Sequence, residues 1–272
     1  MNMNMKNIHI LFFSLFTSVI FSQNNAPELL TKNKITKIII QGYEYQDNSL
    51  IKQTYHVNEI DNYGNTTAFK TYDLNDSLIK ETNYKISDDG KTQYSTTLDE
   101  KGAVNYSHII TKDYENRSMR RLQLNAEGDT LVHQLRIRDK NLKDSILYNI
   151  IKNKRIVSYT WNYNDGEMLI TKAKFDKNGN LINKDIYTYH INGNCVKMRN
   201  ENRTVVSNKC TERNKEIRKF STNRTGYMSG IKLVLEKGGK SIETRLDNGL
   251  VEKKEYFSKK GKLLALLKYT YH

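Results

Sequence analysis

Proline is almost absent from this chain, since Pro27 is the only one in 272 residues. A proline inside a strand removes one N–H donor from the hydrogen-bonded ladder, so proline is rare where strands pair regularly. Tyrosine, by contrast, is abundant with 18 residues, and it suits the pleated, half-wet surface of a sheet. The scarcity of proline therefore favours a chain built from many regular strands.

Cysteine is scarce as well, with only Cys195 and Cys210. The two do not form a Cys-x-x-Cys pair and no histidines cluster in the sequence, so we expect no metal site and no cofactor. A hairpin turn centred on Asn202 and Arg203 would place the two cysteines directly opposite each other, close to the spacing of a disulfide. Two outcomes stay open, a Cys195–Cys210 disulfide or two half-buried thiols.

Long apolar runs are confined to the N-terminus. Lys6 gives a basic start, residues 8–21 are mostly apolar, and Ser22 is a small residue before a polar segment. This order is typical of a secretory signal peptide over residues 1–22. No later stretch reaches the roughly 18 apolar residues of a membrane helix, so we expect no membrane-spanning segment. The mature chain is predicted to be exported to the periplasm, the cell surface or the extracellular space.

Catalytic motifs are missing from the sequence. It contains no Gly-x-Ser-x-Gly elbow and no phosphate-binding loop, and its histidines are dispersed. The acidic pairs Asp88-Asp89 and Asp99-Glu100 fall where turns are expected, because aspartate is a good turn residue. The alternative is that such carboxylates meet in space, as in a glycosidase. We expect no enzyme activity and no catalytic residues.

What the sequence does contain is a repeated unit, clearest over residues 172–198. An apolar run ends at Phe175-Asp176, turns at Asn178-Gly179, resumes, and turns again at Asn192-Gly193. Asn-Gly favours a two-residue hairpin turn in which both central residues have positive φ. Less regular copies follow along the chain at intervals of roughly a dozen residues, which indicates a repeat array.

The segments between turns alternate with period two, as half-buried antiparallel strands do. One such segment places Val157, Tyr159, Trp161 and Tyr163 on a single face, and residues 263–272 are predicted to be a last strand. The fold class is therefore all-β, a repetitive antiparallel β-hairpin meander in one domain over residues 23–272. Strongly twisted sheets rarely exceed about ten strands without bending, so we expect a long curved sheet or an open barrel.

Helical periodicity is nearly absent. Only residues 24–34, with Pro27 near their start, are a candidate for a short helix, because proline is favoured at the first helical position. No linker rich in glycine, serine or proline divides the chain. Both observations agree with a single array of hairpins.

The unit Phe175-Asp176-Lys177-Asn178-Gly179-Asn180-Leu181, with weaker copies at residues 246–250 and 72–78, resembles the tyrosine-aspartate (YD) repeats of RHS-type secreted bacterial proteins. It is also similar to the MORN-like repeats of small exported bacterial proteins. The resemblance covers most of the mature chain and implies a β-hairpin array and export. It supplies no catalytic residues.

Tyr159, Trp161 and Tyr163 form the densest aromatic stripe, and Trp161 is the only tryptophan. A one-sided sheet must fill its buried face, so we expect these rings to be core. The alternative is a ligand stripe, because aromatic rings on a strand face can stack sugars or bases while neighbouring cations attract anions.

Positive charge is in excess, with 44 Lys and Arg against 30 Asp and Glu and a net charge of +14. Such an excess favours anionic partners but does not choose among them. Combined with export, it leads us to expect an anionic envelope glycan or lipid as partner rather than nucleic acid. The function predicted is a non-enzymatic binding or structural module of the envelope or cell surface. The alternative is a carrier that holds a lipid or other hydrophobic ligand in a half-barrel.

Overall fold

The structure is a computed structural model, and it describes residues 27–229 and 231–272 except 201–204. Its elements in chain order are α2 (Pro27–Lys32), β1 (Lys37–Gln46), β2 (Ser49–Ile60), β3 (Thr66–Tyr72), β4 (Leu78–Ile86), β5 (Thr92–Leu98), β6 (Val104–Asp113), β7 (Ser118–Asn125), β8 (Thr130–Arg138), β9 (Asp144–Ile151), β10 (Lys154–Tyr163), β11 (Leu169–Phe175), β12 (Leu181–Asn192), β13 (Cys195–Asn200), β14 (Val205–Glu212), β15 (Lys215–Lys219), β16 (Arg224–Met228), β17 (Ile231–Leu235), β18 (Lys240–Arg245), β19 (Val251–Phe257) and β20 (Leu263–Tyr271).

The predicted fold class is confirmed, because these elements form an all-β, antiparallel hairpin meander. The short helix expected within residues 24–34 is α2, and the expected last strand is β20. The predicted signal peptide lies outside the described residues. Contacts between Cα atoms group the chain into two compact units, which we call unit 1 (residues up to 79 and from 209) and unit 2 (residues 80–208). The expectation of a single domain stays a prediction, and each unit is described by itself.

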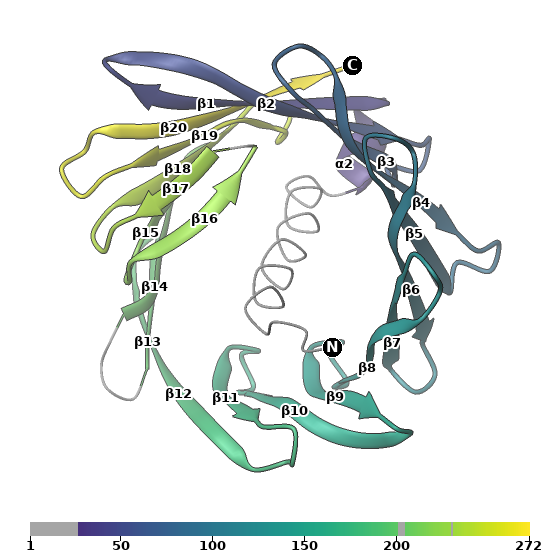
Figure 1. Ribbon diagram of the computed structural model, residues 1–272. Helices are drawn as coiled ribbons and strands as arrows, with labels where there is room; N and C mark the ends of the chain where they lie inside the picture. The colour runs from purple at the N-terminus through teal and green to yellow at the C-terminus, as the bar shows by residue number, and fades with distance from the viewer. Residues whose placement is uncertain (1–26, 201–204, 230) are drawn as a thin grey trace, which may run out of the picture. The chain divides into compact units, whose positions relative to one another are not determined.

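Unit 1 brings the two ends of the described chain together. Its sheet runs in the order β15, β18, β19, β20, β1, β2, β3, and every neighbouring pair is antiparallel. Strand β1 therefore lies beside the C-terminal strand β20, as Figure 1 shows in purple and yellow. The backbone N–H of Thr36 donates to the His272 carbonyl at 2.8 Å, and the His272 N–H donates to Lys37 at 3.0 Å. These ladder bonds join segments that are distant in sequence.

A hydrophobic core lies in unit 1. Leu30 of α2 is 2% exposed, while Ile40 of β1, Val251 of β19 and Leu267 of β20 are at most 1% exposed, and all four belong to one cluster. Fully burying one such aliphatic side chain stabilises a fold by about 1.5–3 kcal/mol. In β20 residues 265–267 are all buried, and the predicted alternation of buried and exposed side chains holds only from Leu267 onward.

The β16–β17 hairpin adds to this core from outside the main sheet. Ile231 and Leu233 of β17 are 1% and 3% exposed and belong to the same cluster. The approach is close at Gly42 of β1, where a Cβ atom would lie 2.7 Å from the Cβ of Ser229. Glycine is thus required at residue 42 because a larger side chain would push the hairpin away.

Unit 2 is a sequential meander in which each strand from β4 to β13 pairs with the next. Its described residues include few buried apolar side chains, namely Leu135, Leu147 and Ala173. Polar residues of unit 2 are buried as well, such as Thr82 and Thr97, whose hydroxyls lie 3.0 Å apart. Unit 2 is therefore held mainly by backbone ladders and polar contacts.

The aliphatic pairs that follow the turns differ between the units. In unit 1 Leu250 and Val251 are 2% and 0% exposed, whereas in unit 2 Leu181 and Ile182 are each 57% exposed. The sequence pattern is the same in both places, so burial here depends on what the rest of the unit packs against it. An aliphatic pair after a turn does not by itself identify a core position.

The turn of the clearest repeat spans Asp176 to Asn180. The Asp176 carboxylate accepts the backbone N–H groups of Asn178 and Asn180 at 2.8 and 2.9 Å, and the Asp176 N–H donates to the Asn180 carbonyl at 2.9 Å. Hydrogen bonds from Asn180 lower the pKa of the Asp176 carboxyl. The same pair of N–H groups, two and four residues on, is accepted by Asp61, Asp73, Asp99 and Asp139.

This geometry corrects the predicted two-residue turn at Asn178-Gly179. Only Gly179 has positive φ there, at 88°, whereas a primed two-residue turn needs it at both central residues. The aspartate explains the difference, because its carboxylate satisfies N–H groups of a longer turn. Positive φ at both central residues occurs at Asp47-Asn48 and at Lys152-Asn153. In the second predicted turn Asn192 pairs with Cys195, so the two central residues are Gly193 and Asn194.

A β-bulge corrects the predicted face of β10. Val157 pairs with Tyr148 and Tyr159 pairs with Leu147, so two steps along β10 match one step along β9. Adjacent residues of β9 point to opposite faces, so Val157 lies on the opposite face from Tyr159 and Trp161. The prediction that Val157 shares one face with Tyr159, Trp161 and Tyr163 is therefore wrong.

The turn geometry predicts a large loss of stability at Gly179 and almost none at Asn178. We expect Gly179→Ala to lower the free energy of unfolding by about 1–2 kcal/mol, because alanine is strained at positive φ. Asn178→Ala should change it by less than about 0.5 kcal/mol, because residue 178 is exposed and contributes only its backbone N–H. Urea unfolding of both variants measures this, and equal losses would indicate a primed two-residue turn instead.

Candidate functional site

The aromatic stripe on β10 is half-buried and does not belong to the hydrophobic core. The rings of Tyr159 and Trp161 stack with centroids 5.6 Å apart and planes 24° from parallel. Tyr163 continues along the same face, and burial raises the pKa of its hydroxyl. The expectation that these rings fill a core is therefore replaced by a partly accessible aromatic surface.

Lysines from neighbouring segments cover this stripe. Lys172 of β11 pairs with Trp161 in register, and its ammonium lies 5.1 Å from the Tyr159 ring centroid and 6.0 Å from that of Trp161. The Lys143 ammonium lies 5.2 Å from the Tyr163 ring and 2.9 Å from the Glu167 carboxylate. Each such cation–π contact contributes about 0.5–1 kcal/mol at an exposed site. Aromatic and cationic groups thus alternate on one surface.

The register extends this surface across unit 2. Tyr159 is aligned through Leu147 with Arg136 of β8, and Arg136 pairs with Met119, which shares its strand face with Arg121 of β7. Farther along, the Lys80 ammonium of β4 donates a 3.0 Å hydrogen bond to the hydroxyl of Tyr106. We call this side of the sheet the Trp161 face. Its basic row consists of Lys80, Arg121, Arg136 and Lys172.

Two acidic residues lie beside the basic row, namely Asp144 next to Arg136 and Asp185 across from Lys172 on β12. Arg136 donates to Asp144 at 2.9 Å, but its Nε is buried without a hydrogen-bond partner. Arg121 donates from Nη2 to His108 Nε2 at 3.4 Å, so its contact there is a neutral ring. A buried N–H donor without a partner is costly. The row therefore suits an anionic ligand with several acceptor groups.

Burial and the charges of the row together shift the pKa values of its groups. Burial, followed by the charge of Arg121, lowers the pKa of His108 to about 4. Burial and the charge of Arg136 lower the pKa of Arg121. Burial raises the pKa of the neighbouring Tyr84 hydroxyl to about 12. Burial penalises charge of either sign, as Tyr84 shows, while the mutual repulsion of the cations adds to the shifts of His108 and Arg121.

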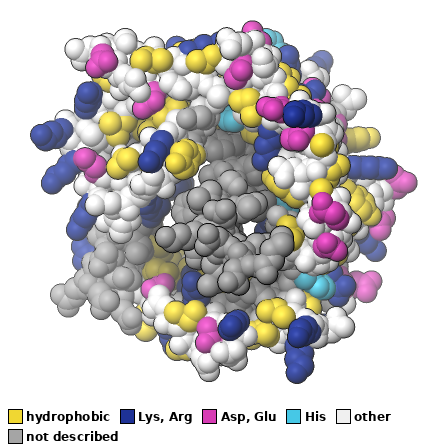
Figure 2. Space-filling view, in the orientation of Figure 1, with side chains coloured by type: hydrophobic (Ala, Val, Ile, Leu, Met, Phe, Trp, Pro, Cys, Tyr) yellow, Lys and Arg dark blue, Asp and Glu magenta, His cyan; other side chains and the backbone are white. Residues whose placement is uncertain are grey.

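Net charge alone would not locate this row. Figure 2 shows Lys and Arg side chains, in dark blue, dispersed over the visible face among acidic ones in magenta. Such dispersion is common on soluble proteins and on protected strand edges. The strand register, and not the density of charge, distinguishes the basic row.

The remaining predicted site residues are the cysteines. Cys195 and Cys210 are each disulfide-bonded, and neither is free. The turn expected at Asn202 and Arg203 lies outside the described residues. An oxidised state suits an exported protein, because disulfides persist in oxidising compartments.

One member of each acidic pair weighed as a catalytic candidate, Asp89 and Asp99, has a structural role. Asp89 accepts the Ser87 hydroxyl at 2.6 Å and the Lys91 N–H at 3.0 Å, and Asp99 accepts N–H groups of its own turn. Hydrogen bonds, first from Ser87, lower the pKa of Asp89. Within the described parts of the chain, no three His, Cys, Asp or Glu residues gather as a metal site would need.

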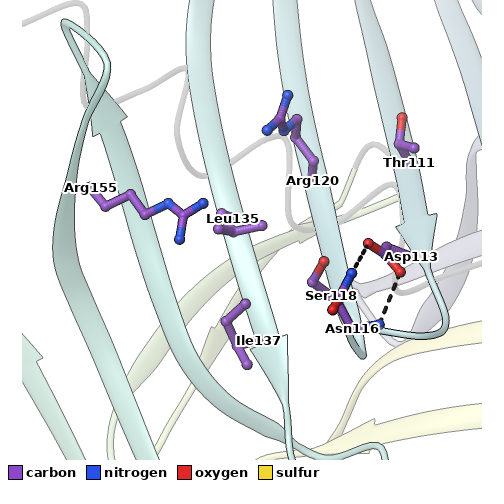
Figure 3. A pocket seen from close by; sticks show the side chains of 8 residues that line it. All are labelled: Thr111, Asp113, Asn116, Ser118, Arg120, Leu135, Ile137 and Arg155. Atoms are coloured by element: carbon purple, nitrogen blue, oxygen red, sulfur yellow. Dashed lines mark hydrogen bonds between the residues drawn. The ribbon is translucent and has the colours of Figure 1, made fainter.

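A cavity of about 500 Å³ lies on the other side of the unit 2 sheet. We call this side the Leu135 face, because Leu135 pairs with Arg120 of β7 and is aligned through Tyr148 with Val157 of β10. Its lining consists of Thr111, Asp113, Asn116, Ser118, Arg120, Leu135, Ile137 and Arg155 (Figure 3). Sequence reasoning missed this cavity, since its residues come from four strands and one turn and form no motif.

Comparisons with known proteins give no family. No family model matches the chain, and no curated protein matches it significantly. A porin-like protein from Bacteroides uniformis is 11% identical, with 88% of this chain and 96% of that chain covered and a TM-score of 0.35. A protein with unknown function from Bacteroides fragilis is 13% identical over 49% and 91% of the two chains, with a TM-score of 0.27.

TcdB2-TccC3 is 12% identical, with 84% of this chain and 15% of that chain covered and a TM-score of 0.23. Because these TM-scores are below 0.5, the similarities support neither a shared family nor a shared function. The hairpin repeats implied by the RHS and MORN-like resemblance are present, while membership of either family stays a prediction. In the part of the chain that the structure describes, no helix is both long and apolar enough to cross a membrane.

The environment of His108 predicts a measurable pH dependence. The folded state binds a proton at His108 only near pH 4, whereas the unfolded state binds one near pH 6.5. Between these values the unfolded state holds more protons, so the free energy of unfolding should fall as pH falls from 6.5 to 4. An NMR titration should give a His108 midpoint near 4, and His108→Gln should flatten this part of the stability profile. A midpoint near 6.5 would mean a solvated ring away from Arg121.

Proposed function

We propose that the protein is an exported, non-enzymatic binding module of the envelope or cell surface, and that its Trp161 face binds an anionic glycan. The observation that carries this proposal is the placement of Lys172 over the stacked rings of Tyr159 and Trp161, at the end of a row of half-buried cations. Rings offer apolar faces to the C–H groups of a sugar, and the cations attract its acidic groups.

The length of the basic row favours a polymer. Lys80 lies on β4 and Lys172 on β11 of a sequential meander. With strands about 4.8 Å apart, seven spacings correspond to roughly 34 Å along the sheet. An extended chain that crosses the strands reaches all four cations, whereas a small ligand reaches one or two. Export favours an envelope glycan over nucleic acid as that polymer.

The proposal of a non-enzymatic role rests on how the carboxylates are used. Asp89, Asp99 and Asp176 accept N–H groups of their own turns, which holds them in place for the fold. A general acid or base instead needs a free proton-transfer position facing a substrate. Simple binding fits these carboxylates better than acid–base chemistry.

Trp161 fluorescence provides the test, because it is the only tryptophan and lies on the proposed surface. Titration with polygalacturonate should give a saturable change that weakens with salt yet persists in part, since ring contacts are not screened. Neutral dextran should give a much smaller change. Lys172→Gln should weaken the affinity about fivefold, or about 1 kcal/mol, by removing one charged contact.

Lys184→Gln is the matched control for this experiment. Lys184 pairs with Ala173 and so lies on the opposite face of the sheet from Lys172, with the same charge and an exposed side chain. It should bind polygalacturonate as the unaltered protein does. No saturable change, equal binding of dextran, or equal losses in both variants would contradict the proposal.

A second candidate function is carriage of a hydrophobic ligand. It is favoured by the exposed aliphatic side chains of unit 2, such as Leu181 and Ile182. Delipidated protein in the same assay, with a fluorescent fatty acid in place of the polymer, separates the two. Uptake of the fatty acid without a response to polygalacturonate would favour the carrier.

A further inference from the structure

Two arginines line the cavity on the Leu135 face. Arg120 of β7 and Arg155 of β10 are both exposed. Figure 3 shows the Arg155 side chain reaching towards Leu135 and Arg120 standing nearby on the neighbouring strand. Two guanidinium groups in one concave site favour an anion, since each presents several donors.

One carboxylate also lines the cavity, and it sets the charge of the ligand. Asp113 accepts the backbone N–H and the side-chain amide of Asn116 at 3.0 and 2.8 Å. These bonds lower the pKa of Asp113, so it stays ionised at neutral pH. Two cations and one anion leave the lining with one net positive charge. The ligand that neutralises it is a monoanion.

The rest of the lining has two kinds of surface. Thr111, Ser118 and Asn116 offer hydroxyl and amide groups on one side, where the dashed bonds of Figure 3 lie. Leu135, which is 6% exposed, and Ile137 form an apolar patch beside them. A volume of about 500 Å³ is within the usual range for small-molecule sites. The ligand should therefore carry hydroxyl groups and also have an apolar side.

We propose that this cavity binds one uronic acid unit of a glycan. Its carboxylate is placed at Arg120 and Arg155, its hydroxyl groups at Thr111, Ser118 and Asp113, and the C–H side of its ring against Leu135 and Ile137. The site goes beyond the proposed function, because it lies on the opposite face from Trp161 and takes a single sugar unit. A chain bound on the Trp161 face and a unit bound here would make the sheet bivalent.

Two other anions fit the lining less well. An acyl chain would cover Thr111, Ser118 and Asn116 without offering them hydrogen bonds, which is costly for polar groups. Inorganic phosphate would use the arginines but leave Leu135 and Ile137 without an apolar partner. Only a hydroxylated monoanion with an apolar side uses all of the lining.

Titration with D-glucuronate, followed by amide NMR shifts of ¹⁵N-labelled protein, tests the assignment. Shifts should be saturable and centred on β6 to β8 and β10. Glucose and acetate, which each lack part of the ligand, should bind at least about tenfold more weakly. Arg155→Gln should weaken glucuronate binding about tenfold, because a charged hydrogen bond is lost. The substitution is at an exposed side chain, so the fold should be unaffected.

Lys154→Gln is the matched control. It removes one positive charge from the residue that precedes Arg155 in β10, and adjacent residues of a strand point to opposite faces. This variant should bind glucuronate as the unaltered protein does. Shifts confined to other strands, equal binding of acetate, or an equal loss in both variants would overturn the assignment. Arg155→Gln should leave the Trp161 fluorescence response to polygalacturonate unchanged. A failure here is therefore distinguishable from a failure of the proposed function.

Discussion

The structure depends on one recurring interaction, the aspartate carboxylate that accepts two backbone N–H groups of its own turn. At Asp176 these are the N–H groups of Asn178 and Asn180, and the bonds leave Gly179 at a φ of 88°. The turn is longer on one side than a primed hairpin turn, so the strands leave it with a register shift, as between Lys174 and Phe175. Each shift decides which side chains reach which face. The strand register therefore determines which side chains share a face of the sheet throughout the repeat array.

The same type of turn occurs in both units, but different interactions stabilise each unit. Unit 1 pairs β1 with β20 and buries Ile40, Val251 and Leu267 in one core, so its stability comes largely from burial of apolar surface. Unit 2 has few buried apolar residues and is held mostly by local ladders. It can expose cations and aromatic rings on one face and a polar cavity on the other without disrupting a core. A binding role therefore suits unit 2 better than unit 1.

Much of the fold could be predicted from the sequence, because scarce proline, period-two alternation and the repeat all indicate hairpins, and α2 lies within the predicted helix over residues 24–34. The turn type could not, since Asn-Gly alone favours a two-residue turn and the effect of Asp176 depends on the geometry of its carboxylate. The predicted face of Val157 was wrong because a β-bulge depends on how two strands pair and is not visible in the sequence of one strand. The stripe of Tyr159 and Trp161 was visible as a run, while the alignment of Arg136 with it depends on register.

Strand register places Lys80 and Lys172 on the Trp161 face, where we propose that the polymer binds, and places Lys184 on the opposite face. Lysine-reactivity footprinting by mass spectrometry, with and without polygalacturonate, tests this proposal directly. The exposed Lys184 lies on the strand next to that of Lys172. We expect the polymer to protect Lys80 and Lys172 and to leave Lys184 fully reactive. Equal protection of all three, or protection of Lys184 alone, would contradict it.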